Sequence, residues 1–207
     1  MLPGAGPTRV DRGPRRTFLG TQTLSRACSV KPHAVVAVTL PGMTCPRLTG
    51  ERVVLEPLTV EHAVEMVDVL SSPALYVLIG GQPPSLPELT ARYQRQTAGP
   101  ASEHEAWLNW VLRSRGRAVG FVQATLRQDE DALSAAVAWL IRPECQGQGL
   151  ATEAAGLMLG HLRRQRVTTV KAWISDANGA SASVATRLAL HRTAHQEDGE
   201  HLWTDAR

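Results

Sequence analysis

A glycine-bearing segment between a strand-like run and a helix-like run constrains the fold of this chain more than any other feature. Residues 132–141 form an apolar run typical of a strand, and residues 150–164 carry apolar side chains at helical spacing. Gly147 and Gly149 lie between the two runs, where they let the backbone approach a ligand closely. The first turn of a helix has unpaired N–H groups and a positive partial charge. Together these features predict a site for a phosphate group.

The rest of the pattern is that of one mixed α/β domain. Short turns separate the predicted strands 106–112, 118–126 and 132–141, so we expect an antiparallel meander there. The strand–loop–helix–strand unit that follows favours an α/β fold, a mixed, mostly antiparallel twisted sheet with helices on both faces. The other predicted elements are strands at 52–58 and 167–175, helices from Thr59 to a stop at Pro73, from Ser85 or Pro87 to about residue 96, and over 181–190, and a closing hairpin over 191–206 that turns at Asp198 and Gly199.

The first 45 residues differ in composition from the rest of the chain. They are rich in Arg, Pro and Gly and hold six basic residues against one acidic residue, whereas residues 46–207 hold 16 basic and 18 acidic residues. We therefore predict a disordered tail over 1–45 and a single folded domain over 46–207. Met43 precedes the first patterned segment, and we hypothesise that natural translation begins near it.

Composition and charge argue against several classes of protein. No apolar run approaches the ~20 residues of a membrane helix, and the nearly neutral folded part weakens the case for nucleic-acid binding. Three cysteines without a C-x-x-C pair argue against a disulfide framework and a structural zinc site. His191, His195 and His201 are expected to lie in the hairpin without binding metal. We expect a cytoplasmic monomer or homodimer with no metal, membrane or nucleic-acid partner.

The glycine-bearing loop also carries a specific motif. Gln146, Gly149 and Ala151 fit the pattern Q/R-x-x-G-x-G/A, which resembles the pyrophosphate-binding motif of the GNAT superfamily of acetyl-CoA-dependent N-acetyltransferases. The resemblance covers most of residues 47–207. Within the superfamily, the sequence is similar in particular to the branch that acetylates ribosomal-protein N-termini (serine/alanine). Four segments carry it in the family's order: LTGER at 48–52, AVGF at 118–121, GLATEA at 149–154 and NGAS at 178–181.

The resemblance implies an enzyme that moves an acetyl group from acetyl-CoA to a primary amine, either a protein N-terminus or a small amine. The amine would attack directly, through a tetrahedral intermediate. The resemblance implies that backbone groups near Trp139, Leu140 and Ile141 hold the pantetheine arm. It also implies that one run of residues holds the pyrophosphate: Gln146, Gly147, Gln148, Gly149, Leu150, Ala151 and Thr152.

The resemblance also implies roles for two residues after the last long strand. Ser181 would give a proton to the departing thiolate, and Asn178 would contact pantetheine or substrate. A helix N-cap is the alternative for Ser181. A turn residue with positive φ is the alternative for Asn178.

Other positions depart from the pattern of the family. Ala136 stands where many relatives have a glutamate, and Tyr76 and Tyr93 lie too early in the chain to act as the general acid. The carboxylates we consider as the base are Asp176, Glu56 and Glu105. These departures keep open a catalytically impaired acyl-CoA-binding or regulatory protein. A dinucleotide-binding protein is a further alternative, although Thr152 stands where its pattern needs Gly or Ala.

Overall fold

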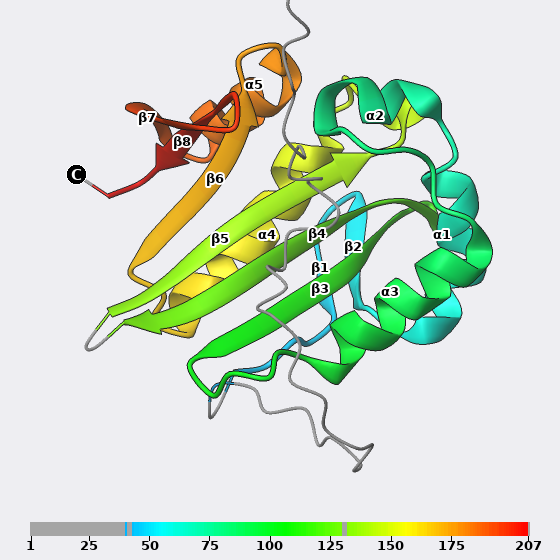
Figure 1. Ribbon diagram of the computed structural model, residues 1–207, viewed down its shortest axis with the longest axis horizontal. Helices are drawn as coiled ribbons and strands as arrows, with labels where there is room; N and C mark the ends of the chain where they lie inside the picture. The colour runs from blue at the N-terminus through cyan, green and yellow to red at the C-terminus, as the bar shows by residue number, and fades with distance from the viewer. Residues whose placement is uncertain (1–39, 41–42, 130–131, 207) are drawn as a thin grey trace, which may run out of the picture.

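The computed structural model describes residues 40, 43–129 and 132–206, so most of the predicted tail lies outside the described residues. The described strands form one sheet in the order β1-β2-β3-β4-β5-β6-β8-β7 (Figure 1). The strands are β1 (Leu48–Thr49), β2 (Val53–Pro57), β3 (Glu105–Ser114), β4 (Arg117–Asp129), β5 (Ala132–Ile141), β6 (Thr169–Ser175), β7 (His191–Glu197) and β8 (Glu200–Thr204). The α-helices are α1 (Ala63–Val69), α2 (Pro73–Ile79), α3 (Leu86–Ala98), α4 (Leu150–Arg164) and α5 (Gly179–Arg187).

The sheet is mixed and mostly antiparallel, as the sequence predicts. Strands β5 and β6 form its parallel pair, and the other neighbouring strands run antiparallel. The closing hairpin turns at Asp198 and Gly199, which have φ angles of 52° and 83°. Its second strand, β8, pairs with β6, and β7 lies at the edge. This order brings Glu200 beside Ser175 at the end of β6.

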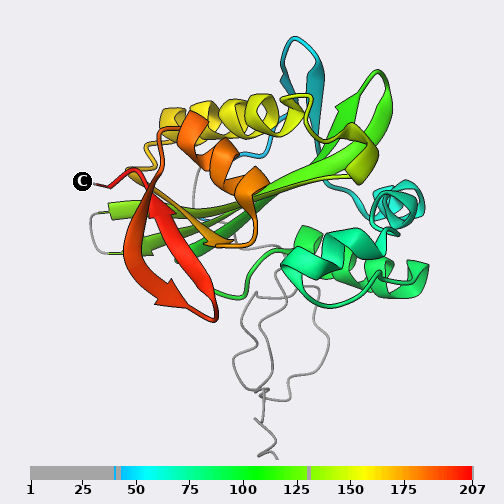
Figure 2. The same cartoon turned by 90° about the horizontal axis from the view of Figure 1, so that it is seen from above.

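Helices cover both faces of the sheet. Figure 2 shows α4 and α5 on one face and α1, α2 and α3 on the other. Strand β5 alternates between the two layers: Val137, Trp139 and Ile141 belong to the core cluster under α4, whereas Leu140 belongs to the cluster under α1 and α3. Burying a Leu or Met side chain in such a core contributes about 1.5–3 kcal/mol. The two layers therefore hold β5 firmly from both sides.

The helical region before β3 differs from the prediction. The segment from Thr59 begins as a 3-10 turn (Val60–His62) that leads into α1, and the helix ends before Pro73 as expected. A further helix that we did not predict, α2, then starts with Pro73 itself. Proline suits the first helical position because its missing N–H would be unpaired there anyway. Strand β1, only two residues long, was also not predicted.

Residues that we assigned to the tail contact the folded domain. Leu40 is buried, and Met43 and Cys45 pack partly buried against the core under α4. The backbone N–H of Thr44 donates to Oε1 of Gln165 at 2.8 Å. The packed part of the chain therefore includes residues before 46.

No single helix in the described ranges is long and apolar enough to span a membrane. One pair of helical segments, Val60–Val69 with Pro73–Ile79, meets the length and composition criterion only when the two are joined across a 98° bend.

Candidate active site

The loop between β5 and α4 presents a row of backbone donors. Gly147 and Gly149 have φ angles of 74° and 77°, a left-handed conformation that side chains disfavour. Gly149 is the N-cap of α4, and the first hydrogen bond of this helix joins Glu153 N–H to the Gly149 carbonyl at 3.1 Å. Within the described residues, the backbone N–H groups of 147–152 have no acceptor. Consecutive N–H groups without an acceptor at a helix N-terminus are an arrangement that suits an anion.

Side chains hold this loop in place from both ends. Nε2 of Gln146 donates to the Ile141 carbonyl at 2.8 Å, and its backbone N–H donates to the Pro143 carbonyl at 3.2 Å. Gln146 therefore shapes the loop. Gln148 does not line the cleft described below; its side chain approaches the Glu144 carbonyl at 3.4 Å.

Arg52 connects the loop to the first turn of α4. Its Nη1 donates to the Gln148 carbonyl and its Nε to Oε2 of Glu153, each at 2.8 Å. The backbone N–H of Arg52 also donates to Glu153, at 2.8 Å. Burial opposes the charge on Glu153, but these hydrogen bonds outweigh it and lower the pKa of Glu153. We had not predicted this role for Arg52.

A large cleft opens where β5 and β6 separate. The two strands pair only over Ser134–Ala136 and Thr169–Lys171, which leaves the end of β5 without a neighbour on that side. The cleft has a volume of about 1190 Å³, and its wall includes Trp139, Leu140 and Ile141. Gly147, Gly149 and Leu150–Thr152 line the same cleft. The structure thus brings the predicted pantetheine residues and most of the predicted pyrophosphate residues to one surface.

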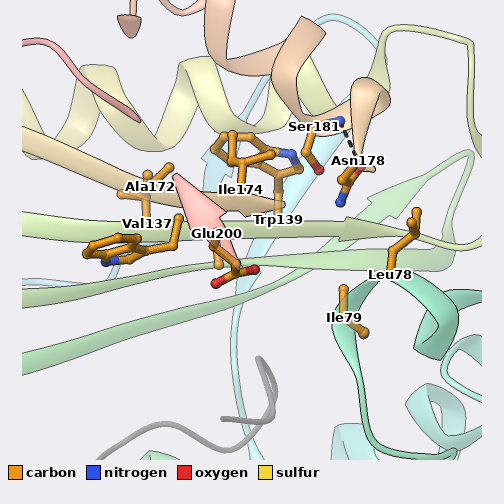
Figure 3. Close-up of a pocket in the computed structure, with 11 residues that line it drawn as sticks. Leu78, Ile79, Val137, Trp139, Ala172, Ile174, Asn178, Ser181 and Glu200 are labelled. Atoms are coloured by element: carbon orange, nitrogen blue, oxygen red, sulfur yellow. Dashed lines mark hydrogen bonds between the residues drawn. The ribbon is translucent and has the colours of Figure 1, made fainter. Parts of the chain in front are cut away.

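The inner end of the cleft adjoins a small hollow, shown in Figure 3. Trp139, Asn178, Ser181 and Glu200 all line it. Oδ1 of Asn178 accepts a hydrogen bond from the Ser181 backbone N–H at 3.1 Å, and Asn178 is the N-cap of α5. The φ angle of Asn178 is −98°, so it is not the turn residue with positive φ that we considered. Asn178, and not Ser181, caps the helix, which leaves the Ser181 hydroxyl available for chemistry.

The three carboxylates that we considered as the base do not line these cavities. Asp176 is exposed and pairs with Arg192 at 2.8 Å. Glu56 pairs with Arg113, and Glu105 accepts from Nε1 of Trp107 at 2.6 Å.

Glu200 is the carboxylate that reaches the hollow. Burial first, and then the charge of Asp198, raise the pKa of Glu200. Because β8 pairs directly with β6, Glu200 lies opposite Ser175. We missed this residue because the sequence predicts the hairpin but not which of its strands adjoins β6.

A second hollow lies beside the first one. It has a volume of about 540 Å³, and Glu200 and Leu78 line both. Ala136, the position at which the family resemblance implies a glutamate, forms part of its wall and shares this cavity with Glu200. The two tyrosines lie elsewhere: both Tyr76 and Tyr93 are buried in the cluster under α1 and α3.

The sequence model of the acetyltransferase (GNAT) domain family matches residues 52–191. The chain therefore belongs to the GNAT acetyltransferase family, and it is an acyltransferase. A search of curated proteins gave no match.

Solved structures share the fold at low sequence identity. RimL, a ribosomal α-N-protein acetyltransferase in complex with coenzyme A, gives a TM-score of 0.64 at 15% identity over 78% of this chain and 100% of that chain. The aminoglycoside acetyltransferase AAC(6')-Ib, also with coenzyme A, gives a TM-score of 0.61 at 16% identity, over 75% of this chain and 95% of that chain. An acetyltransferase from Thermus thermophilus gives a TM-score of 0.61 at 19% identity, over 74% of this chain and 96% of that chain.

Proposed function

We propose that this protein transfers an acetyl group from acetyl-CoA to a primary amine. The observation that carries the proposal is the set of N–H groups without an acceptor at 147–152, because Gly147 and Gly149–Thr152 of this set line the same cleft as Ser181. The donors suit a diphosphate, and we place the thioester where the cleft reaches Trp139, Asn178 and Ser181. The cleft also contains Arg164 and Arg187, whose charges favour an anionic ligand.

The chemistry needs one group that accepts a proton and one that donates a proton. Glu200 takes a proton from the acceptor ammonium, which frees the amine to attack the thioester carbon. The tetrahedral intermediate then loses a second N–H proton to solvent and expels the thiolate of coenzyme A. Ser181 protonates that sulfur and regains its own proton from solvent, and Glu200 releases its proton to solvent. The net products are the N-acetyl amine, coenzyme A and one proton.

The second hollow favours a cationic acceptor. Its lining includes Glu197, Asp198 and Glu200, and no Lys, Arg or His is among the described residues that line it. Gln123 and Thr125 supply neutral polar groups, and α2 supplies an apolar wall. A protonated primary amine is stabilised in such surroundings, whether it is a protein N-terminus or a small amine.

A catalytically impaired acyl-CoA-binding protein is the second candidate, and the observation that favours it is Ala136 at the position of the family's glutamate. The position of Glu200 in the same cavity favours the enzyme. Compartment and assembly stay predictions: the cytoplasm, and a monomer or homodimer. The free thiols of Cys45 and Cys145 suit a reducing compartment.

Thiol release from acetyl-CoA separates the two candidates. The acceptor panel consists of spermidine, kanamycin and a tetrapeptide with a free N-terminus. We expect amine-dependent release of coenzyme A with at least one of them. Binding of coenzyme A without release for any amine would support the impaired protein, and stabilisation by NAD but not coenzyme A in a thermal-shift assay would support a dinucleotide-binding protein.

A further inference from the structure

The indole N–H of Trp139 is a polar group in the small hollow of Figure 3, and the proposed reaction does not yet use it. Trp139 is only 8% exposed, and its Nε1 is buried with no hydrogen-bond partner in the described part of the chain. Buried donors in folded proteins are nearly always paired, because an unpaired donor loses its hydrogen bonds to water without replacement. We therefore expect another group to accept a hydrogen bond from Nε1 during the reaction.

The Ser181 hydroxyl is placed to be that group. Trp139 and Ser181 line both the cleft and the small hollow at its end. Figure 3 shows the indole nitrogen of Trp139 on the side of the ring that faces Ser181. Among the residues that the structure describes, the Ser181 hydroxyl forms no hydrogen bond.

The backbone of Ser181 is already fixed while its side chain is not. Its N–H donates to Oδ1 of Asn178 at 3.1 Å, in the first turn of α5. A rotation about the Ser181 side-chain bond changes the direction of Oγ without moving this backbone. A serine hydroxyl can accept one hydrogen bond while it donates another.

We propose that Trp139 positions the Ser181 hydroxyl by donating its indole hydrogen to Oγ. With that lone pair engaged, the Ser181 hydrogen points toward the departing sulfur. The bond also stabilises the negative charge on Oγ while the proton is away, so the hydroxyl becomes a better acid. Trp139 gains and loses no proton in this step. The proposal rests on the proposed function, since it assigns to Ser181 the proton that the thiolate takes up.

A double-mutant cycle tests this coupling. Trp139→Phe removes the N–H and keeps an aromatic wall, and we expect kcat to fall about 10-fold, the effect of one hydrogen bond, with little change in KM for acetyl-CoA. In the Ser181→Ala background the same substitution should have no further effect, because the group that the indole positions is gone. Rates are measured by thiol release with the most active amine of the panel above.

The matched control is Trp107→Phe on β3. Its Nε1 donates to Oε1 of Glu105 at 2.6 Å, away from the cleft. We expect this variant to leave kcat unchanged in both backgrounds. If Trp139→Phe does not fold, as judged by thermal melting, Trp139→Met provides an adaptable side chain without a donor, and the same pattern is expected.

Three results would overturn the proposal. Unchanged kcat in Trp139→Phe shows that the indole N–H contributes nothing. Equal losses of kcat on Trp139→Phe in the wild-type and Ser181→Ala backgrounds show that Trp139 acts independently of Ser181. The proposed acetyl transfer, with Ser181 as the acid, is still supported in that case if Ser181→Ala alone lowers kcat. Full activity of Ser181→Ala removes both the acid role of Ser181 and its positioning by Trp139.

Discussion

At the scale of single residues, the account depends most on Glu200. Burial and the charge of Asp198 raise the pKa of its carboxyl, and a base must be deprotonated before it can accept a proton. Activity should therefore be lost as the pH falls through this raised pKa. We expect Glu200→Gln to lower kcat/KM by about 10²- to 10⁴-fold, the usual contribution of a general base, and to remove this acidic limb of the pH–rate profile.

The matched control for Glu200→Gln is Asp176→Asn, because Asp176 is an exposed carboxylate outside the cavities. We expect it to keep a rate within about twofold of the wild type and the same acidic limb, as surface substitutions usually do. A Glu200→Gln variant with an unaltered pH–rate profile would show that another group is the base.

Glu200 should also influence stability, with a sign opposite to that of a salt-bridged glutamate. Its pKa is raised in the folded chain, so the folded state binds this proton more tightly than the unfolded state does. The resulting contribution is complete below the unfolded pKa and is lost as the pH rises through the folded pKa. We therefore expect Glu200→Gln to raise Tm slightly at pH 8 and to have less effect at pH 4, in scanning calorimetry. A lower Tm at pH 8 would contradict this reasoning.

At the scale of elements, Arg52 tests how the phosphate loop is held. Arg52 bonds the Gln148 carbonyl and Glu153 together, so Arg52→Gln should weaken coenzyme A binding about 10-fold, as loss of a charged hydrogen bond would. Arg47→Gln is the control, since exposed Arg47 pairs with Glu56 outside the cleft. Calorimetric titration measures both. Arg52 could act by holding the loop through Glu153 or by contacting the anion itself, and Glu153→Gln separates these two roles. Weaker binding of coenzyme A confirms that the Arg52–Glu153 pair holds the loop. Tighter binding would mean that Arg52 acts on the anion directly.

The contact between β4 and β5 gives a second prediction at this scale. A Cβ on Gly120 would lie 1.9 Å from the Leu140 carbonyl oxygen, on the strand that forms the cleft wall. Gly120→Ala must push β5 aside, and we expect it to reduce the free energy of unfolding by at least about 1–3 kcal/mol in urea titrations. Gly179→Ala is the control because its Cβ would meet nothing within 4 Å. Equal stability of the two variants would contradict the close approach of these strands.

At the scale of the whole molecule, the sequence predicted the parts whose structure is determined locally. The β5–loop–α4 unit could be predicted because strand pattern, Gly147, Gly149 and helix pattern all lie in one stretch. Glu200 could not, because its position depends on β8 pairing with β6, a contact between segments distant in sequence. Helix α2 was missed for a different reason: Pro73 stops a helix or starts one, and the local sequence does not distinguish these outcomes.

The central claim is that the free N–H groups of 147–152 bind the diphosphate of coenzyme A. Its most direct test is calorimetric titration of the full chain with coenzyme A and, separately, with pantetheine, which has the same thiol arm but lacks the diphosphate and the adenosine 3′-phosphate joined to it. We predict that coenzyme A binds at least about 100-fold more tightly, roughly 2.7 kcal/mol of binding free energy. Equal affinities for the two compounds, or no binding of coenzyme A at millimolar concentration by the folded protein, would contradict the account.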